Sequence, residues 1–246
     1  MADANPLGVT IVIPAYNEES RLPATLDEVL GYLQQTPWDW SIRIVDDGSG
    51  DGTAAVAERY ARAHPRVVLQ REPHGGKGAA VKAGLLAAGS EYRFICDADL
   101  SMPIREVERF LPPYVTNADV AIATREGAGA RRVGEPLRRH LVGRMFNTLV
   151  QWLLLPGLED TQCGFKMFTA RAVEQVFPFV TVEGWSFDIE ALYLARRQGL
   201  RIVEVPIEWH YRPDSRLNVL RDGPAMFAEL LRIRRRSGDP RARAVR

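Results

Sequence analysis

Short runs of β-branched and other apolar residues alternate with helical patterns through the first half of the chain, and this alternation limits the possible folds. Five runs are typical of buried strands, at residues 9–13 (ended by Pro14), 41–45, 67–69, 92–96 and 119–123. Apolar spacing predicts helices between them, at residues 21–35, 53–63, 77–88 and about 104–115. Strands that alternate with helices of about 10 to 15 residues are typical of βαβ units. The sequence therefore predicts an α/β fold with a mostly parallel central sheet flanked by helices.

The second half of the chain has a less regular pattern. We expect helices at residues 136–155, 187–197 and 224–236, and strands at 164–168 and 201–205. Because neither a change in composition nor a Ser/Gly-rich linker separates the two halves, we predict a single domain over residues 1–236. Residues 237–246 are rich in arginine and are predicted to form a disordered basic tail.

Composition and charge exclude several classes of protein. With 46% hydrophobic and 26% charged residues, the 246-residue chain is typical of a soluble globular protein. It has no apolar run of about 18 residues and no basic, apolar start, so we expect neither a transmembrane helix nor a signal peptide. Cys96 and Cys163 form no CxxC pair, which favours a reducing compartment. Acidic residues slightly outnumber basic ones before Arg232, which argues against a nucleic-acid-binding core.

Three of the predicted strands run directly into acidic segments, at residues 14–19, 46–53 and 97–99. In an open parallel sheet, ligands bind outside the carboxyl ends of the strands, so we expect these segments to converge on one crevice. Turn formation and helix capping explain Asp51 and Thr53, which precede a predicted helix. They do not explain Asp46 and Asp47, because adjacent carboxylates after a buried strand are costly without a compensating ligand.

Two segments contain the residue types of a phosphate and metal site. Asp97 and Asp99 share one side of an extended segment, and such a pair suits a Mg²⁺ or Mn²⁺ ion that also binds a diphosphate. Lys77, flanked by Gly76 and Gly78, opens a predicted helix, where backbone amides and a cation can approach a phosphate. This segment matches neither a Walker A loop nor a GxGxxG fingerprint, and a flexible loop with an exposed lysine is the alternative interpretation.

Together these segments resemble the GT-A glycosyltransferases of family 2. The matching motifs are PAYNE at residues 14–18, VDDGS at 45–49, DGT at 51–53, GKG at 76–78 and DADLS at 97–101. DTQCGFK at 160–166 and WSFDIE at 185–190 narrow the resemblance to the dolichyl-phosphate β-glucosyltransferases, beside the dolichyl-phosphate mannose synthases. The resemblance extends from about residue 9 to 235. It implies a GT-A fold with a nucleotide-sugar half at about 9–124 and an acceptor half at about 125–236.

The resemblance also implies which residues bind each substrate. The nucleotide-sugar is expected to contact Pro14, Tyr16, Glu18, Asp46, Asp47, Ser49, Lys77 and Asp97. Asp97 and Asp99 are expected to hold the diphosphate-bound Mg²⁺ or Mn²⁺. Ser101 stands where many mannose synthases have a glutamine as a further metal ligand, so its hydroxyl, directly or through water, is the candidate third ligand. The sugar and the acceptor are expected to contact Arg125, Arg144, Gln162, Trp185 and Asp188.

The implied reaction is an inverting transfer of a hexose, glucose from UDP-glucose, to a polyprenyl or dolichyl phosphate. The residues expected to take part in catalysis are Asp97, Asp99, Arg125, Arg144 and Asp160. The acceptor phosphate is already ionised near neutral pH, so no strong general base is needed, and arginines suit the binding of two neighbouring anions. Asp160 and Asp188 are expected to bind sugar hydroxyls or orient an arginine, with a structural ion pair or helix cap as the alternative.

A lipid acceptor implies contact with a membrane surface, and we expect a peripheral protein at the cytoplasmic face. Helix 136–155 and segment 224–246 both combine an apolar stripe with arginines, as interfacial helices do. The stripe of the first contains Leu137, Leu141, Met145, Leu149, Trp152 and Leu153, and that of the second Met226, Phe227, Leu230, Leu231 and Ile233. The alternative is that these stripes belong to the core and that the arginines are solvated.

Other functions stay open at the level of the sequence. GDP-mannose is an alternative donor, because Asp46 and Asp47 can hydrogen-bond either base, and a soluble acceptor is also compatible with the motifs. A nucleotidyltransferase also uses a carboxylate-bound metal, but it normally has a basic, glycine-rich loop where this chain has the acidic segment 14–18. A non-catalytic nucleotide-sugar-binding protein would bind the nucleotide-sugar without turnover. The intact acidic pairs at 46/47 and 97/99 argue against this function.

Overall fold

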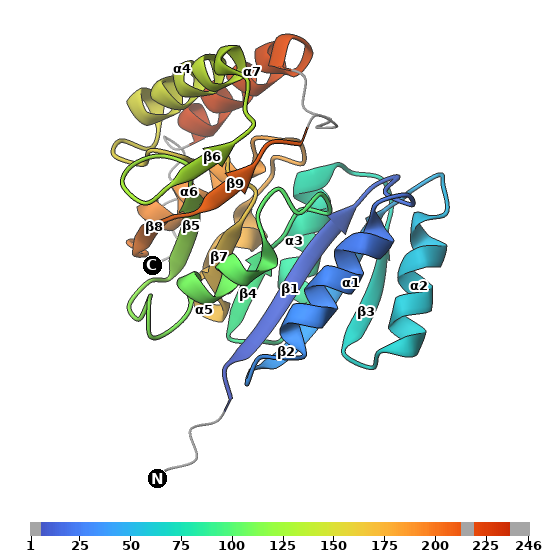
Figure 1. Cartoon of the computed structure of the whole chain (residues 1–246). Helices are drawn as coiled ribbons and strands as arrows, with labels where there is room; N and C mark the ends of the chain where they lie inside the picture. The colour runs from blue at the N-terminus through green and yellow to red at the C-terminus, as the bar shows by residue number, and fades with distance from the viewer. Residues whose placement is uncertain (1–5, 213–218, 237–246) are drawn as a thin grey trace.

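The computed structural model describes residues 6–212 and 219–236, and a seven-stranded sheet runs through it (Figure 1). In spatial order the strands are β3 (Val67–Glu72), β2 (Asp39–Asp47), β1 (Gly8–Ala15), β4 (Tyr92–Ile95), β7 (Lys166–Thr169), β5 (Val120–Thr124) and β8 (Ile202–Pro206). Neighbouring strands are parallel, except that β7 runs antiparallel to both β4 and β5. The predicted α/β fold with a mostly parallel sheet is confirmed.

Helices cover both faces of the sheet, because alternate residues of a buried strand point to opposite sides. In β1, Val9, Ile11 and Ile13 pack in one apolar cluster, whereas Val12 packs in the other. The first cluster includes α1 (Leu22–Leu33), α2 (Thr53–Ala63) and the 3₁₀ helix η1 (Ile104–Phe110). The second includes α3 (Lys77–Ala87), α5 (Ala170–Val176), the 3₁₀ helix η2 (Phe177–Phe179) and α6 (Phe187–Arg197). Between these layers, the carboxyl ends of β1, β2 and β4 meet at one edge of the sheet.

Helix α3 lies very close to the sheet at Gly84. A Cβ atom there would lie 2.5 Å from Val12 Cγ1 and 2.7 Å from Val45 Cγ2, so any side chain would push the helix away from β1 and β2. The short distance between helix and sheet keeps α3, whose first residue is Lys77, against β1 and β2, the two strands that end in acidic segments.

Two further helices pack against the second apolar cluster. α4 (Leu137–Leu153) and α7 (Val219–Arg236) pack side by side, at the top of Figure 1. A two-stranded parallel ribbon, β6 (Arg131–Val133) with β9 (Glu208–His210), lies between these helices and the main sheet in the same view. Because β7 comes from the second half of the chain and lies between β4 and β5, one sheet is shared by both halves.

Several element boundaries differ from the sequence-based predictions. Pro14 does not end the first strand but lies within β1, and its place is tolerated because pairing with β4 stops at Val12. The helix expected at 104–115 is a 3₁₀ helix that ends at Phe110, since the Pro112-Pro113 pair cannot continue it. α7 begins before Pro224, and α5, β6 and β9 were not predicted. The expected basic tail, 237–246, lies outside the described residues.

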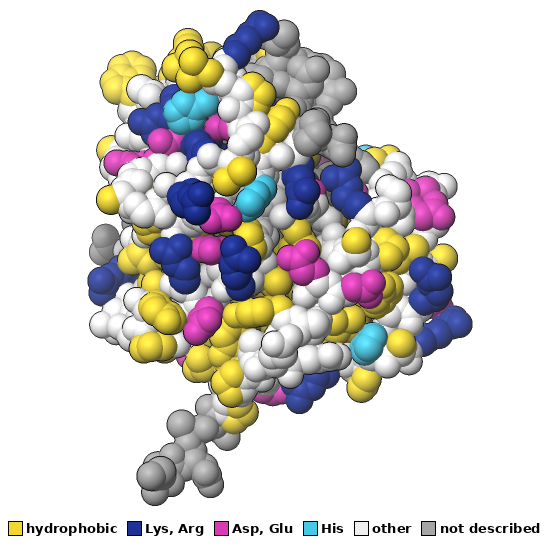
Figure 2. Space-filling model, in the orientation of Figure 1, with side chains coloured by type: hydrophobic (Ala, Val, Ile, Leu, Met, Phe, Trp, Pro, Cys, Tyr) yellow, Lys and Arg dark blue, Asp and Glu magenta, His cyan; other side chains and the backbone are white. Residues whose placement is uncertain are grey.

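The apolar stripes of the two outer helices have different surroundings. In α4, the side chains of Leu137, Leu141, Met145 and Trp152 are between 55% and 79% exposed, whereas Leu149 and Leu153 pack partly in the core. Figure 2 shows hydrophobic side chains projecting at the top of the molecule, where α4 lies in Figure 1.

The expected surface stripe on α7 is wrong for three of its residues. Met226, Leu230 and Ile233 are buried, and Leu230 and Ile233 pack with the second apolar cluster. Phe227 remains half-exposed. Every helix in the described ranges is either too short or too polar to cross a bilayer.

Candidate active site

Two cavities adjoin each other at the carboxyl edge of the sheet, and four residues line both. One cavity, of about 470 Å³, lies beside the ends of β1 and β2. The other, of about 200 Å³, lies between the ends of β4 and β5 and helix α4. The shared residues are Lys77, Asp97, Asp99 and Trp185. A ligand that occupies the first cavity therefore reaches the second at these four side chains.

A stacked aromatic pair, Tyr16 and His74, and the loop of residues 74–76 form one wall of the first cavity. The rings of Tyr16 and His74 stack with their centroids 4.2 Å apart and their planes 18° from parallel. The buried carboxylate of Asp47 accepts hydrogen bonds from the backbone N–H groups of Gly75 (2.9 Å) and Gly76 (3.0 Å), and it lies 2.9 Å from His74 Nδ1. Asp47 therefore holds the loop that positions His74 against Tyr16. Planar rings at this edge suit a planar base.

Two of the expected nucleotide-sugar contacts lie behind the wall of this cavity. Asp46 is buried and accepts the backbone N–H of Ser49 at 3.3 Å. The Ser49 hydroxyl in turn accepts the backbone N–H of Asn17 at 2.9 Å. Among the described residues, Asp46 and Ser49 do not line either cavity, and their hydrogen bonds join the loop after β2 to the loop after β1. Their geometry is that of residues that position the site.

A fixed positive charge lies where the two cavities meet. Lys77 Nζ is 2.6 Å from Asp97 Oδ1 and 5.5 Å from the centroid of the Trp185 ring. Burial alone would lower the pKa of Lys77, but the charge of Asp97 and its hydrogen bond outweigh burial and raise it. Lys77 is therefore an ammonium ion at neutral pH, opposite a carboxylate and at the start of α3.

The carboxylates of Asp97 and Asp99 line both cavities and can supply oxygen ligands to a divalent cation. Asp99 Oδ1 accepts the backbone N–H of Ser101 at 2.9 Å, which fixes the turn after β4. A Cβ atom at Gly164 would lie only 2.0 Å from Asp97 Oδ2, so a glycine is required beside that oxygen. The described residues contain no group of three or more His, Cys, Asp or Glu side chains arranged as a metal site. A cation held here would take further ligands from water or a bound diphosphate, as Mg²⁺ commonly does.

In the second cavity, Arg125 forms a two-pronged ion pair with Asp160. Arg125 Nε and Nη2 lie 2.6 Å and 2.9 Å from the two carboxylate oxygens, and the backbone N–H of Arg125 donates a third hydrogen bond at 3.0 Å. Burial would raise the pKa of Asp160, but the Arg125 charge and these hydrogen bonds lower it overall. Asp160 and Arg125 therefore form a fixed ion pair, a geometry that fits both the predicted role of orienting an arginine and the alternative of a structural ion pair.

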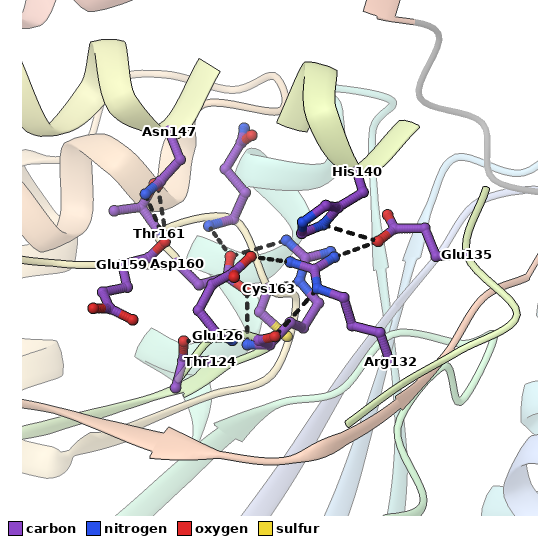
Figure 3. Close-up of polar contacts among 12 residues, drawn as sticks. Thr124, Glu126, Arg132, Glu135, His140, Asn147, Glu159, Asp160, Thr161 and Cys163 are labelled. Carbon is purple, nitrogen blue, oxygen red and sulfur yellow. Dashed lines mark hydrogen bonds and ion pairs between the residues drawn. The ribbon is translucent and has the colours of Figure 1, made fainter. Parts of the chain in front are cut away.

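A second arginine cluster lies on the α4 side of the same cavity (Figure 3). Arg132 forms an ion pair with Glu126 and donates to Glu135 Oε2 at 2.5 Å. Arg144 Nη1 lies 3.5 Å from Glu126 Oε2, so the Glu126 carboxylate is shared between two arginines. His140 descends from α4 with its Nδ1 3.5 Å from Glu135.

The loop that carries Asp160 is clamped from two sides. The buried Asn147 side chain, on α4, donates to Glu159 O at 2.6 Å and accepts from the Thr161 hydroxyl at 2.9 Å. From the other side, the Glu204 carboxylate of β8 accepts the backbone N–H groups of Glu159 and Asp160, both at 3.0 Å. This loop joins α4 to the Arg125–Asp160 pair.

Asp188, at the start of α6, forms the expected alternative, a structural ion pair. Its Oδ2 lies 3.0 Å from the ammonium group of Lys166, which is fully buried in β7 and also donates to Cys163 O. Asp188 nevertheless lines the second cavity, as do Gln162 and Ser101. Burial raises the pKa of the Cys163 thiol to about 11, so this thiol is neutral at physiological pH.

The structure brings most of the predicted residues together. All of the predicted site residues except Asp46 and Ser49 line a cavity. The first cavity is lined by Pro14, Tyr16, Glu18 and Asp47, and the second by Ser101, Arg125, Arg144, Asp160, Gln162 and Asp188. Both cavities are lined by Lys77, Asp97, Asp99 and Trp185.

Sequence reasoning missed four residues that support the site from outside the strand ends. These are His74, Arg132, Asn147 and Lys166. The sequence indicated two of them, Asn147 and Lys166, as polar residues within apolar patterns. Asn147 interrupts an apolar helical pattern and Lys166 interrupts a buried strand, and a polar residue in such a position must find partners.

Comparison with known proteins places these motifs in a family. The model of the family described as glycosyl transferase family 2 matches residues 10–177. A dolichyl-phosphate beta-glucosyltransferase of Trichomonas vaginalis is 36% identical over 222 residues, which are 85% of this chain and 66% of that protein. The proteins of the same name from Homo sapiens and Saccharomyces cerevisiae are 32% and 30% identical, covering 93% and 94% of this chain and 75% of each relative. The chain thus spans two thirds to three quarters of their length.

Solved structures share the fold at lower identity. A mannosyl-3-phosphoglycerate synthase from Rubrobacter xylanophilus superposes with a TM-score of 0.68 at 20% identity, covering 98% of this chain and 77% of that one. A glucosyl-3-phosphoglycerate synthase from Mycobacterium tuberculosis, solved with Mn²⁺, uridine diphosphate and glucosyl-3-phosphoglycerate, gives 0.68 at 17% identity, covering 93% and 80%.

Proposed function

The chain belongs to glycosyltransferase family 2, and on that basis we propose that it transfers glucose from UDP-glucose to dolichyl phosphate or a related polyprenyl phosphate. The observation that carries this proposal is the pair of cavities joined at Lys77, Asp97, Asp99 and Trp185. A glycosyl transfer needs a donor and an acceptor that meet at one carbon atom, and two cavities with a shared charged wall supply that geometry. The names of the relatives support glucose as the sugar and dolichyl phosphate as the acceptor.

The first cavity is the proposed site of the nucleotide. Its stacked Tyr16 and His74 rings suit a planar base, and Lys77 at the start of α3 suits the diphosphate. Uridine diphosphate in the related Mycobacterium tuberculosis structure supports a uridine nucleotide here.

Asp97 and Asp99 are the residues that would hold Mg²⁺ or Mn²⁺, and Mn²⁺ in the same related structure supports a divalent ion. The ion, when bound, supplies positive charge against the charge that develops on the leaving diphosphate. Lys77 supplies a second positive charge at the same place. Ser101 fixes the Asp99 carboxylate through its backbone N–H, and its hydroxyl stays the proposed third ligand.

The second cavity is the proposed site of the sugar and the acceptor phosphate. Arg125 and Arg144 present guanidinium groups to it, and these pair well with phosphate oxygens. Because the acceptor oxygen is already ionised, the protein has to position it and shield its charge, and no side chain has to remove a proton. Asp188 and Gln162 line this cavity and are the proposed contacts of the sugar hydroxyls.

Helix α4 is the proposed contact with the membrane surface at its cytoplasmic face. Leu137, Leu141 and Met145 recur every four residues, so they share one exposed side of the helix, and Trp152 continues the stripe. Its other side closes the second cavity, so a lipid whose chain lies among these residues can place its phosphate next to Arg144. Two buried, unpaired cysteines fit a reducing compartment.

A transfer assay tests this function. Purified protein is incubated with labelled UDP-glucose, GDP-mannose or UDP-galactose, a divalent metal ion and a short-chain dolichyl phosphate, and the label is then extracted into organic solvent. We expect label in the organic phase from UDP-glucose alone. Asp99→Asn should lower transfer by about 100-fold or more, because it removes a charge at the diphosphate. The matched control is Asp39→Asn, an exposed residue distant from both cavities, which should transfer as the wild type does.

Transfer from GDP-mannose in place of UDP-glucose would show that the donor assignment is wrong. Transfer from no donor, with binding of UDP-glucose retained, would refute the proposed reaction.

A further inference from the structure

In the second cavity, the carboxylate of Glu126 lies between two arginines, Arg132 and Arg144. Glu126 contacts Arg132 through Oε1 (Figure 3). Through Oε2 it contacts Arg144 at 3.5 Å. The Glu126 side chain is only 17% exposed. Arginine pairs in the same geometry with a carboxylate and with a phosphate, so the place between two guanidinium groups suits either anion.

The cluster also contains buried nitrogen atoms without a hydrogen-bond partner in the described ranges. Arg144 Nη1, a donor, lies 3.5 Å from Glu126 Oε2 and makes no hydrogen bond to it. His140 Nδ1 lies 3.5 Å from Glu135 and likewise makes none. A buried donor without an acceptor is costly, and a phosphate with several oxygens satisfies more donors than the two oxygens of Glu126 do.

Glu126 differs from the two other carboxylates of this cavity wall. Asp160 accepts three hydrogen bonds from Arg125 alone. Glu135 pairs with Arg132 and lies near His140, whereas Glu126 pairs with Arg132 and with Arg144. Glu126 follows the last residues of β5 and precedes Gly127, whose φ of +80° is one that glycine adopts easily. Among the three, Glu126 is the carboxylate that lies between two arginines of the cavity wall.

We propose that Glu126 occupies the place of a phosphate group between Arg132 and Arg144, and that a phosphate must displace it to bind. Glu126 thereby lowers the affinity of the cavity for phosphate monoesters and keeps the arginines oriented between turnovers. The phosphate is taken to be that of the acceptor, and in this respect the inference rests on the proposed function. The diphosphate of the donor is the other source of the same chemistry, and the two are distinguished below.

Calorimetric titration of the full chain with methyl phosphate and, separately, with UDP tests the inference. The titrations are run at about pH 8, where a phosphate monoester is a dianion. Glu126→Gln keeps the shape of the side chain and removes its charge. We expect it to bind methyl phosphate about fivefold more tightly than the wild type does, and to bind UDP with unchanged affinity.

Glu58→Gln is the matched control, because Glu58 also bridges two arginines, Arg62 and Arg71, but does so on the surface of α2. It should change neither affinity. Glu126→Asp keeps the charge on a shorter side chain that cannot span both arginines, and an intermediate gain in methyl phosphate affinity is expected. This variant decides the question if Glu126→Gln does not fold.

Weaker or unchanged binding of methyl phosphate by both Glu126 variants would overturn the inference. A gain for UDP in place of methyl phosphate would assign the displaced position to the donor and would overturn it as stated. The inference and the proposed function fail separately. Tighter methyl phosphate binding in a protein that transfers no glucose supports the inference alone, and transfer with no change in phosphate affinity supports the proposed function alone.

Discussion

Two aspartates separated by a single residue have different surroundings, and these give them different expected roles. Asp97 is paired with Lys77 at 2.6 Å, whereas Asp99 is held by the backbone of Ser101. The sequence motif predicted a shared metal site for both carboxylates. It did not predict that a lysine from the start of α3 would lie against one of them, because all of α3 and β4 separates Lys77 from Asp97 in the chain.

Replacement of Lys77 by alanine should lower kcat by about 100-fold, because the positive charge at the junction of the cavities is lost. The measurement is the steady-state rate of transfer at saturating donor and acceptor. Lys82→Ala is the matched control, since Lys82 lies on the same helix but contacts the backbone of Val180 at 2.7 Å. Equal rates for both variants would contradict the role given to Lys77.

Replacement of Asp160 by asparagine should destabilise the fold by about 3 kcal/mol at pH 7, because Arg125 would keep a partly buried charge without a partner. The pKa of Asp160 is depressed in the folded state, so its contribution is present above the pKa of an unfolded aspartate, about 4, and is lost as the pH falls through the folded value. The difference in unfolding free energy between wild type and variant should therefore shrink at acid pH. Urea unfolding across this range measures it, and a difference independent of pH would contradict the ion pair.

At the scale of helices and strands, periodicity predicted the elements that are long or strictly alternating. Helices α2 and α6 have the predicted boundaries, and the five strands of the first half all lie in the sheet. The short elements β6, β9 and α5 were missed because three to seven residues carry too little periodicity to be distinguished from turns. Pairing with distant segments forms them, and a single sequence does not show that pairing.

Asn147 connects α4 to the loop of Asp160, and Asn147→Ala tests this connection. The variant should lose about 2 kcal/mol of stability, because backbone carbonyl and hydroxyl groups of the loop lose their buried partner. It should also raise the KM for the acceptor more than that for the donor. Thr148→Ala, next to it on the exposed side of α4, is the control. Unfolding in urea and initial rates measure both effects, and equal behaviour of the two variants would contradict the clamp.

The exposed stripe of α4 should determine binding to lipid. Trp152→Ser is expected to weaken binding to vesicles that contain anionic lipid by about tenfold, because a large apolar side chain is no longer buried. Tyr114→Ser is the control, since Tyr114 is 65% exposed after η1 and away from α4. Sedimentation with vesicles measures the binding. An equal effect of both substitutions, or of neither, would contradict a specific contact through α4.

At the scale of the molecule, the sequence predicted both the α/β GT-A fold and the convergence of three acidic segments, and both are confirmed. Convergence could be predicted because the carboxyl ends of parallel strands share one edge. The second cavity could be predicted only through the resemblance, since Arg132 and Asn147 reach it from β6 and α4. Tertiary packing brings those elements over the sheet, and local sequence patterns do not encode their position.

We propose that donor and acceptor meet where the two cavities share Lys77, Asp97, Asp99 and Trp185. A crystal structure of the protein with UDP-glucose and Mn²⁺ tests it most directly, with the anomalous signal of manganese as the marker. We expect the base beside Tyr16 and His74, the manganese signal at Asp97 and Asp99, and the glucose facing Arg125. A nucleotide bound elsewhere, or manganese away from both aspartates, would contradict it.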